Sequence, residues 1–514
     1  MVVHGKQPRH VAWTLGRKRR AAEIEPLYFE QFYLACLSHA SYMIASEGEA
    51  AVIDPQRDIG IYLDEAARHG FTIRHVIETH LHADFVSGHR ELAERTGAKI
   101  YLGARAGAQF PHVPVHDGHE LSIGKIKLKF LETPGHTIES ISIVVTEAGV
   151  VAGPGVVTGP GVVTESGAAG DPLVFTGDTL FIGDVGRPDL SPDLTPQQLA
   201  AMLYDSLHNK LLALPDSTRV YPAHGAGSLC GRQMSTERSS TIGKQRATNY
   251  ALRASSKEEF VQLLTSELPQ RPGYFSQDVE LNRTGAAALT ELPPLATLTP
   301  DQVIEKQKAG GVVLDTRPPM QYAVAHIAGS IQIGLSGQFA SWAGIVLGLN
   351  QELVLVAEDD EHIQETRLRL ARVGIERIAG YLEGGVTSWI RAGRPVVYLP
   401  NIEVDELRKL LAEDPGYLHV IDVRKPAEFE SGHIPGAVSK PVDELADALD
   451  GLDRERPVAV YCKSGYRSSI AGSLLERAGF KQVINLTGGY DAWLAVNGPP
   501  PPGPELPRAQ PSGS

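Results

Sequence analysis

Cysteine is scarce in this chain, which contains three in 514 residues. So few thiols exclude a disulfide-rich secreted scaffold and favour a reducing compartment, which predicts a cytoplasmic protein. The sequence also lacks an apolar run of the roughly 18 residues that a membrane-spanning helix requires. Basic residues do not outnumber acidic ones, and the formal net charge of −13 argues against a general role on nucleic acids or anionic membranes.

The first 22 residues depart from this acidic balance, because they carry six basic side chains and no acidic one. They have no apolar segment of the kind found in secretory signals, so we expect residues 1–25 to be a disordered basic extension. Residues 499–514 are rich in Pro and Ser and are expected to be a disordered tail. A Gly- and Pro-rich stretch at 148–172 contains a duplicated GPGVVT and is expected to be a long loop between two strands.

The length predicts about three domains, and the residue patterns indicate where they lie. Alternating strand and helix patterns run through residues 26–272, with two strands expected in the opening segment 28–55. A Pro-rich segment within 273–295 predicts a linker. Two similar stretches of about 100 residues follow, at 296–398 and 399–498, and the segment VVLDTRPPMQYAVAHIAGSI of the first matches HVIDVRKPAEFESGHIPGAV of the second. Each copy is expected to be a small α/β domain.

Six potential metal ligands each lie at the end of a predicted strand or in the loop just beyond it. They are His80, His82, Asp84, His136, Asp178 and His224. Side chains from one sheet edge can converge on a single point, and imidazole with carboxylate suits zinc, iron or manganese. The spacing alone leaves open which of the six bind a metal directly.

This spacing, over residues 28–250, resembles that of the metallo-β-lactamase superfamily, whose first motif is HxHxDH. The resemblance implies an α/β fold of the αββα sandwich type. Phe85 stands where the motif ends in a histidine that binds the second metal of binuclear members, so a binuclear zinc hydrolase is disfavoured. Within the superfamily, the domain is most similar to the persulfide dioxygenases.

That similarity implies one Fe(II) per chain, rather than zinc, in a facial triad of two histidines and one carboxylate. The implied ligands are His80, His136 and Asp178. The three other residues, His82, Asp84 and His224, would orient ligands or bound water, or form an additional metal site. Arg187 is a candidate for binding a substrate carboxylate, and the alternative is that it fixes a loop through Asp189.

A second candidate site follows a predicted strand at 458–461. The loop that begins with Cys462 continues through Lys463, Ser464, Gly465, Tyr466, Arg467 and Ser468. A strand, a tight loop and a helix N-terminus direct backbone N–H groups at the sulfur, and Arg467 adds a positive charge. Such surroundings lower the pKa of a thiol and stabilise a thiolate or persulfide. A buried, inert cysteine is the alternative.

The Cys462 loop resembles the active-site loop of the rhodanese sulfurtransferases, as do Asp422, Arg424, Glu428 and the GHIPGA segment. The resemblance implies small domains with parallel sheets. In the first copy, the corresponding positions are Ala357, Glu358 and Asp359, so this copy is expected to be catalytically silent and to serve as a packing or docking module. Of the other cysteines, Cys36 is expected to be structural. Cys230 is also expected to be structural, with a place near the metal site as the alternative.

The domain order is similar to that of bacterial persulfide dioxygenase–sulfurtransferase fusions. This implies that a low-molecular-weight thiol persulfide reacts with O₂ to give sulfite and free thiol, and that Cys462 forms or uses thiosulfate, as in sulfide detoxification. The sequence leaves open the thiol carrier, the direction of sulfur transfer and whether the chain forms a homo-oligomer. Two alternatives are a zinc thioester hydrolase resembling glyoxalase II, fused to a sulfurtransferase, and a non-catalytic sulfur carrier or sensor.

Overall fold

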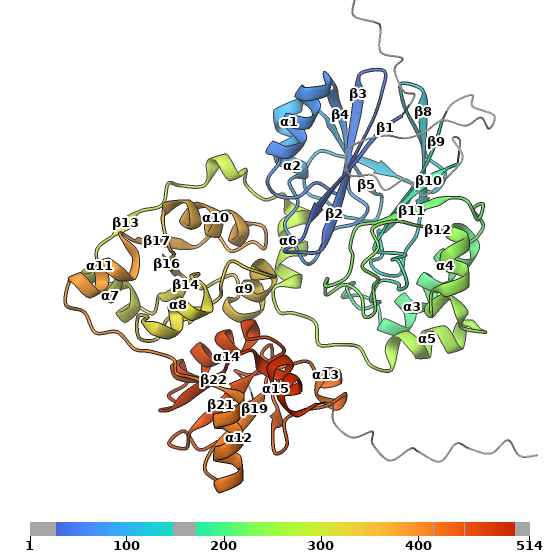
Figure 1. Ribbon diagram of the computed structural model, residues 1–514. Coiled ribbons are helices and arrows are strands. Elements are labelled where there is room, and N and C mark those ends of the chain that lie inside the picture. Colours follow the sequence, from blue (N-terminus) through green and yellow to red (C-terminus); the bar gives the residue numbers. More distant parts are fainter. Residues whose placement is uncertain (1–26, 148–170, 415, 447, 499–514) are drawn as a thin grey trace, which may run out of the picture.

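The computed structural model describes residues 27–147, 171–414, 416–446 and 448–498 (Figure 1). The predicted basic extension, the predicted tail and nearly all of the predicted loop at 148–172 lie outside these residues. Within the described ranges, no helix combines the length and the apolar character needed to cross a membrane.

The first domain is built on two six-stranded sheets. In spatial order, the first sheet contains β1 (Tyr28–Leu34), β2 (His39–Ser46), β3 (Glu49–Ile53), β4 (Thr72–Ile77), β5 (Lys99–Gly103) and β6 (Val113–Val115). The second contains β12 (Ser240–Thr241), β11 (Arg219–Pro222), β10 (Leu173–Gly177), β9 (Ile141–Glu147), β8 (Ile126–Glu132) and β7 (Glu120–Ile123). Both sheets mix parallel and antiparallel pairs.

The two sheets pack face to face, and helices cover both outer faces. Along β2, Tyr42 and Ile44 enter the core between the sheets, whereas Met43 and Ala45 belong to the outer core, as the alternation of strand side chains requires. The first sheet is covered by α1 (Gly60–His69) and α2 (His89–Thr96). The second is covered by α3 (Pro196–Ser206), η1 (Leu207–Leu211), α4 (Ile242–Thr248), η2 (Ala251–Arg253) and α5 (Lys257–Thr265). The αββα sandwich implied by the resemblance is confirmed.

Each copy of the repeat contains a five-stranded sheet whose strand pairs are all parallel. The first sheet contains β13 (Thr297–Leu298), β17 (Ile378–Leu382), β16 (Leu353–Val356), β14 (Val312–Asp315) and β15 (Ile331–Gln332). The second contains β18 (Asn401–Ile402), β22 (Val483–Leu486), β21 (Val458–Tyr461), β19 (His419–Asp422) and β20 (Val438–Ser439).

Helices accompany each of these parallel sheets. The first copy has α7 (Pro300–Lys308), α8 (Pro319–Val324), α9 (Phe339–Leu347), α10 (Asp360–Ala371) and α11 (Gly385–Arg391). The second has α12 (Val404–Glu413), α13 (Pro426–Glu430), α14 (Tyr466–Arg477) and α15 (Gly489–Asn497). Two small rhodanese-like α/β domains therefore follow the sandwich, as predicted.

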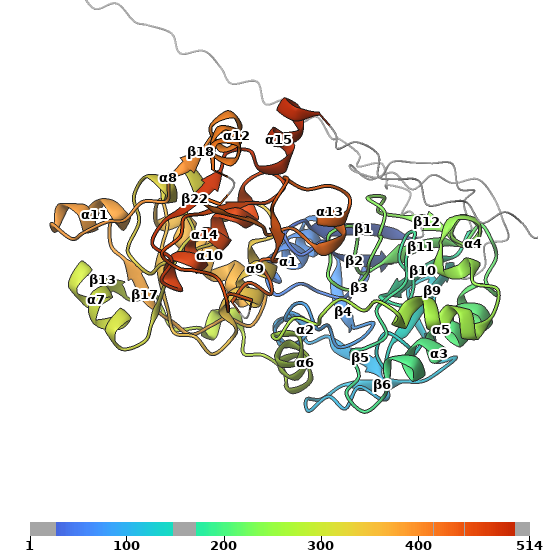
Figure 2. The same ribbon diagram turned by 90° about the horizontal axis from the view of Figure 1, so that it is seen from below.

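Two local features differ from what the sequence patterns suggested. Residues 28–55 form three strands rather than two, because the chain turns back between β1 and β2, where Ser38 has a φ of 54°. The predicted linker 273–295 contains helix α6 (Phe275–Thr284) and the short turn η3 (Leu289–Glu291). Helix α6 lies between the sandwich and the first rhodanese-like domain (Figures 1 and 2).

Candidate metal centre and thiol site

Four loops bring the predicted metal ligands to one end of the sandwich. His80 follows β4, His136 lies between β8 and β9, Asp178 follows β10 and His224 follows β11. Strands β10 and β11 run parallel, and β9 runs antiparallel to β10, so the last three residues share one edge of the second sheet. His80 comes from the facing sheet, so the site lies between the two sheets at one end of the sandwich.

Three of these residues form a compact, buried group. The ligand atoms of His80, His136 and Asp178 all lie within 4.8 Å of one another. Asp178 Oδ2 is 3.8 Å from His80 Nε2 and 3.4 Å from His136 Nε2. His136 Nε2 is buried and has no hydrogen-bond partner. Burial lowers the pKa of both histidines, which keeps the rings neutral, and a neutral ring is the form that binds a metal. This donor set fits a metal ion.

The backbone around the site sets which nitrogen of His136 faces Asp178. The ring Nδ1 donates to the carbonyl oxygen of Arg187 at 2.9 Å, and this leaves Nε2 free for a metal. Gly186 makes this approach possible, because a Cβ there would lie 2.1 Å from Asp178 O and 2.7 Å from His136 Nδ1. The glycine in the segment IGDVGRPDLS is therefore required by close packing against the site.

His224 holds the carboxylate of Asp178 in place. Its Nδ1 donates to the two oxygens of Asp178 at 2.8 and 3.0 Å, and its Nε2 lies 3.0 Å from Asp84 Oδ2. Burial alone would raise the pKa of Asp178, but the charge and hydrogen bond of His224 keep it well below its usual range. The two carboxylates in turn raise the pKa of His224, against the opposing effect of burial. A charged Asp178 is thus available as a ligand.

His82 faces a different set of partners. Its Nε2 lies 3.2 Å from Asp54 Oδ1 and 3.4 Å from Glu78 Oε2. Burial opposes protonation, yet the two carboxylates raise the pKa of His82 to about 10. Among the described residues, the possible metal groups that include His82 contain neither His80 nor His136. His82 therefore lies beside the group of His80, His136 and Asp178 and is not part of it.

Asp54 and Glu78 were not singled out from the sequence, although both are fully buried beside the site. Asp54 directly follows the apolar strand β3 and accepts hydrogen bonds from the backbone N and the hydroxyl of Thr79, at 2.7 and 2.9 Å. Its position after an apolar strand is the same signal that identified Asp178. Glu78 lies two residues before His80, and only the structure shows that its carboxylate lies against the ring of His82.

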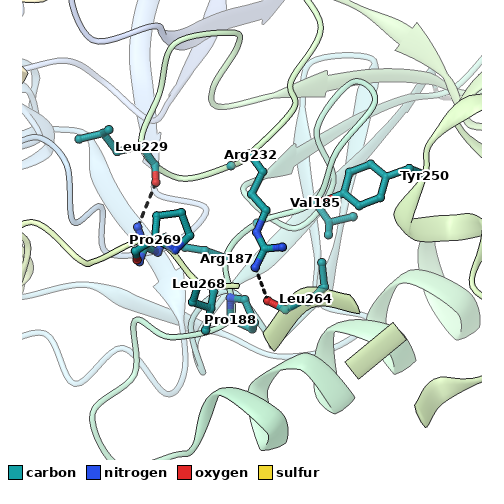
Figure 3. Close-up of a pocket in the computed structure, with 11 residues that line it drawn as sticks. Val185, Arg187, Pro188, Leu229, Arg232, Tyr250, Leu264, Leu268 and Pro269 are labelled. Atoms are coloured by element: carbon teal, nitrogen blue, oxygen red, sulfur yellow. Dashed lines mark hydrogen bonds between the residues drawn. The ribbon is translucent and has the colours of Figure 1, made fainter. Parts of the chain in front are cut away.

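Arg187, whose carbonyl oxygen contacts His136, is one of the residues that line a pocket (Figure 3). Its guanidinium donates to both carboxylate oxygens of Asp189, at 2.7 and 2.9 Å. It also donates to the carbonyl oxygens of Leu229 and Pro269, at 3.3 and 2.6 Å. Because these acceptors occupy most of its donors, the geometry favours the loop-fixing interpretation over binding of a substrate carboxylate.

Cys230 also lies against the metal group. Its sulfur is within 4.8 Å of the ligand atoms of Asp178 and His224. Burial raises the pKa of this thiol well above its usual value, and the nearby carboxylates of Asp84 and Asp178 add to the effect. The structure thus places Cys230 beside the metal site, which was the alternative to a purely structural position.

The thiol site has the strand–loop–helix form that the sequence predicted. Cys462 follows β21 directly, and α14 begins four residues later. The cysteine is buried, and the backbone N–H of Gly465 donates to its sulfur at 3.1 Å. Lys463 and Ser464 are exposed at the rim of the loop. The hydroxyl of Ser468, at the start of α14, donates to the carbonyl oxygen of Gly465.

Arg467 is fixed beside this loop by an acid from another helix. Its two terminal nitrogens donate to the carboxylate of Glu428 in α13, at 2.6 and 2.8 Å. Burial opposes ionisation of both groups, but their hydrogen bonds raise the pKa of Arg467 and lower that of Glu428. Tyr466 points elsewhere, and its hydroxyl donates to the carbonyl oxygen of Gly334 in the first rhodanese-like domain.

The first rhodanese-like domain has no thiol at the equivalent position. In its sheet Val356 pairs with Asp315, as Tyr461 pairs with Asp422 in the second domain, so Ala357 occupies the place of Cys462. The loop that follows is acidic, and Asp359 accepts a hydrogen bond from the backbone N of His362 at the start of α10. This copy therefore lacks a thiol at the position of Cys462, and its catalytic silence stays a prediction.

Comparisons with known proteins agree with this division of the chain. The metallo-beta-lactamase superfamily matches residues 34–224, and the rhodanese-like domain family matches residues 299–392 and 403–496. The mitochondrial persulfide dioxygenase ETHE1 of Bos taurus is 30% identical over 222 residues, which cover 42% of this chain and 71% of that protein. A hydroxyacylglutathione hydrolase of Methylobacillus flagellatus is 29% identical, over 51% of this chain and 85% of that protein.

Coverage of the curated relatives varies, and one of them is matched over only 50% of its own length. A solved structure covers more of this chain. The crystal structure of a metallo-beta-lactamase from Staphylococcus aureus subsp. aureus COL is 33% identical, covers 70% of this chain and 99% of that chain, and superposes with a TM-score of 0.59. This chain therefore belongs to the metallo-beta-lactamase superfamily and carries two tandem rhodanese-like domains after its metallo-beta-lactamase domain.

Proposed function

We propose that this protein is an iron-dependent persulfide dioxygenase joined to a sulfurtransferase. The observation that carries the proposal is the make-up of the buried metal group, which contains His80, His136 and Asp178 without His82. Two histidines and one carboxylate on one side of a metal are typical of non-haem Fe(II) oxygenases. The persulfide dioxygenase relative and the fusion to a rhodanese-like domain support the same reading.

Fe(II) held by these three residues would supply reactivity toward O₂, which redox-inert zinc does not have. The chain's own residues prepare the site for it. The Arg187 carbonyl orients His136, and His224 keeps Asp178 ionised and correctly placed. Because the group is almost fully buried, the surrounding protein also limits the access of bulk water.

The proposed oxidation balances as RSSH + O₂ + H₂O → RSH + SO₃²⁻ + 2H⁺, with R a low-molecular-weight carrier. The terminal sulfur of the persulfide is oxidised, O₂ is reduced, and the S–S bond to the carrier breaks. The carrier thiol keeps one proton, and two protons are released to solvent. The chain itself is unchanged by the reaction and contributes orientation and a low-dielectric environment.

At the second site, the Cys462 sulfur accepts a sulfane sulfur and becomes a persulfide. The N–H of Gly465, which points at this sulfur, stabilises the negative charge. Attack of sulfite on the outer sulfur then releases thiosulfate and restores the thiolate, so that overall RSSH + SO₃²⁻ → RSH + S₂O₃²⁻. The reverse direction would use thiosulfate and a thiol to supply persulfide.

Zinc thioester hydrolysis is the second candidate, because relatives at similar identity are named hydroxyacylglutathione hydrolases. Phe85 and the engagement of His82 by Asp54 and Glu78 argue against it. A hydrolase of this kind would contain zinc after purification without added metal and would cleave S-lactoylglutathione. Neither property is expected of this protein.

The deciding experiment is O₂ uptake by protein loaded anaerobically with Fe(II) and then given glutathione persulfide. We expect O₂ consumption with sulfite as a product, and thiosulfate as a further product when persulfide is in excess. Sulfite and thiosulfate are quantified by chromatography. Absence of uptake with several thiol persulfides, in protein that holds one Fe(II) per chain, would refute the dioxygenase and favour the hydrolase.

Arg467→Lys is expected to lower the rate of thiosulfate-to-thiol sulfur transfer on the order of tenfold. Lysine keeps the positive charge but cannot reproduce the two-pronged contact with Glu428. Initial rates of transfer measure the effect. Arg408→Lys is the matched control, because Arg408 forms an exposed ion pair with Asp405 in the same domain and should be replaceable without loss. Wild-type rates in Arg467→Lys would contradict the assigned role.

A further inference from the structure

The loop of residues 80–87 carries the proposed ligand His80 and is called the metal loop. It is held by a residue about 200 positions later in the chain. Asn282 of helix α6 donates through Nδ2 to the carbonyl oxygens of His82 and Phe85, both at 2.8 Å. Its Oδ1 accepts from the backbone N of Ser87, also at 2.8 Å. Asn282 is 1% exposed, so these backbone groups depend on it rather than on water.

The first rhodanese-like domain holds the same loop directly. The backbone N of Val86 donates to the carbonyl oxygen of Arg372, at the end of α10, at 2.8 Å. The side chain of Arg372 forms two parallel hydrogen bonds with Asp58 of the sandwich, both at 2.8 Å. A second ion pair across this boundary joins Arg57 to Glu376 at 2.8 Å. Both arginines are buried, so the pairs are shielded from solvent.

Apolar packing closes the same boundary. Phe85 is fully buried and shares one contiguous core with Tyr274 and Phe275 at the start of α6 and with Ala340 and Ala343 of α9. The views in Figures 1 and 2 both place α6 beside the sandwich, next to α2. Phe85 thus stands where the motif of binuclear relatives has a metal ligand, and in this chain it contacts His82 and belongs to the core that continues into the neighbouring domain.

We propose that the silent rhodanese-like domain is a structural part of the metal centre. In this view, Asn282 and Arg372 are positioning residues that fix the backbone of residues 80–87, and thereby the approach of His80 to His136 and Asp178. The domain lacks the thiol needed for catalysis but keeps the surface that holds this loop. Hydrogen-bond partners that orient metal ligands typically affect metal affinity by 10- to 100-fold, and Asn282 and Arg372 act on His80 through the backbone of its loop.

Fe(II) affinity of the full chain tests this directly, by anaerobic competition with a chromophoric chelator. Asn282→Asp and Arg372→Ala are each expected to weaken Fe(II) binding at least tenfold, because each loosens the ligand loop. The visible absorption of bound Co(II) should change as well, since it reports the arrangement of ligands. Thiosulfate-to-thiol transfer at Cys462 should remain within twofold of wild type, which shows that the second rhodanese-like domain is folded, and thermal unfolding checks the rest of the chain.

Arg394→Ala is the matched control, because Arg394 pairs with Asp301 within the same domain and away from the boundary. It should leave Fe(II) affinity unchanged. Asp58→Asn removes the negative charge of the Arg372–Asp58 pair with little change of shape. It replaces Arg372→Ala as the test variant if Arg372→Ala does not fold. Asn282→Gln, which keeps the amide but displaces it, should be intermediate between wild type and Asn282→Asp.

Unchanged Fe(II) affinity in Asn282→Asp and Arg372→Ala would overturn the proposal. Equal losses of metal affinity and sulfur transfer in Asp58→Asn would also overturn it, because the boundary would then only stabilise the chain as a whole. The proposal rests on the metal site described above but not on its reaction. Wild-type protein that binds one Fe(II) yet consumes no O₂ would refute the dioxygenase and leave this inference standing.

Discussion

His136→Ala is expected to abolish O₂ uptake with a thiol persulfide, with a loss on the order of 100-fold or more, because it removes one of three proposed ligands. We expect no neighbouring group to take over as a ligand, because His136 Nε2 is the buried nitrogen that lies 3.4 Å from Asp178 Oδ2. Iron content should fall below one per chain in the same variant. An oxygen electrode and metal analysis measure the two effects.

Sulfur transfer provides the internal control for this variant. Cys462 belongs to a separate domain with its own sheet, so thiosulfate-to-thiol transfer should continue at the wild-type rate in His136→Ala. His119→Ala is the matched substitution, because His119 packs against Phe130 in the same domain without joining the metal group. If His136→Ala kept O₂ uptake, the proposed set of ligands would be incorrect.

Cys462→Ser is expected to reduce thiosulfate-to-thiol sulfur transfer to the uncatalysed background. The serine hydroxyl does not ionise near neutral pH and cannot form a persulfide, although it fits the same space. O₂ uptake with glutathione persulfide should remain close to wild type, and sulfite should accumulate because it is no longer converted to thiosulfate. Rates of both half-reactions, with product analysis, test the separation.

Cys36→Ser makes the same chemical change at another buried cysteine and should leave sulfur transfer intact. A Cys462→Ser protein that lost both activities, with normal iron content and thermal unfolding, would show that the two sites do not act separately. Loss of both activities would also mean that Cys462 must supply sulfur to the metal site before oxidation. Sulfite accumulation is therefore the observation that distinguishes the two orders of reaction.

Much of the candidate site could be predicted because each residue stands in a recognisable local setting. Asp178 and His224 end two strands that prove to be parallel neighbours, and parallel strands place such ends together. Cys462 likewise lies between an apolar strand and an amphipathic helix, and the pairing of β19 with β21 sets the preceding residue, Tyr461, beside Asp422. The parallel sheets themselves were implied by the family resemblance, because their strands β14, β16 and β21 are buried along their whole length and show no alternation.

Other contacts could not be read from the residues that make them. Glu78 and Asp54 engage His82, and only their distances show that this histidine is not grouped with His80 and His136. Arg187 was open to two interpretations until Asp189 and two carbonyls were seen to occupy its donors. In each case several partners were chemically suitable, and packing selected one.

By itself, the sequence determined where the strand-end candidate ligands and Cys462 stand and that the first repeat has no cysteine, and its resemblance to known families predicted the αββα and parallel-sheet architecture. Strand and helix patterns and motif spacing are local properties, and they are sufficient to place these residues and to reveal the resemblance. Only the tertiary structure decided that a predicted linker becomes helix α6, and that Asn282 and Arg372 hold the metal loop. These contacts join residues about 200 to 290 positions apart, and such pairs are chosen by how complete surfaces fit together, which no local pattern encodes.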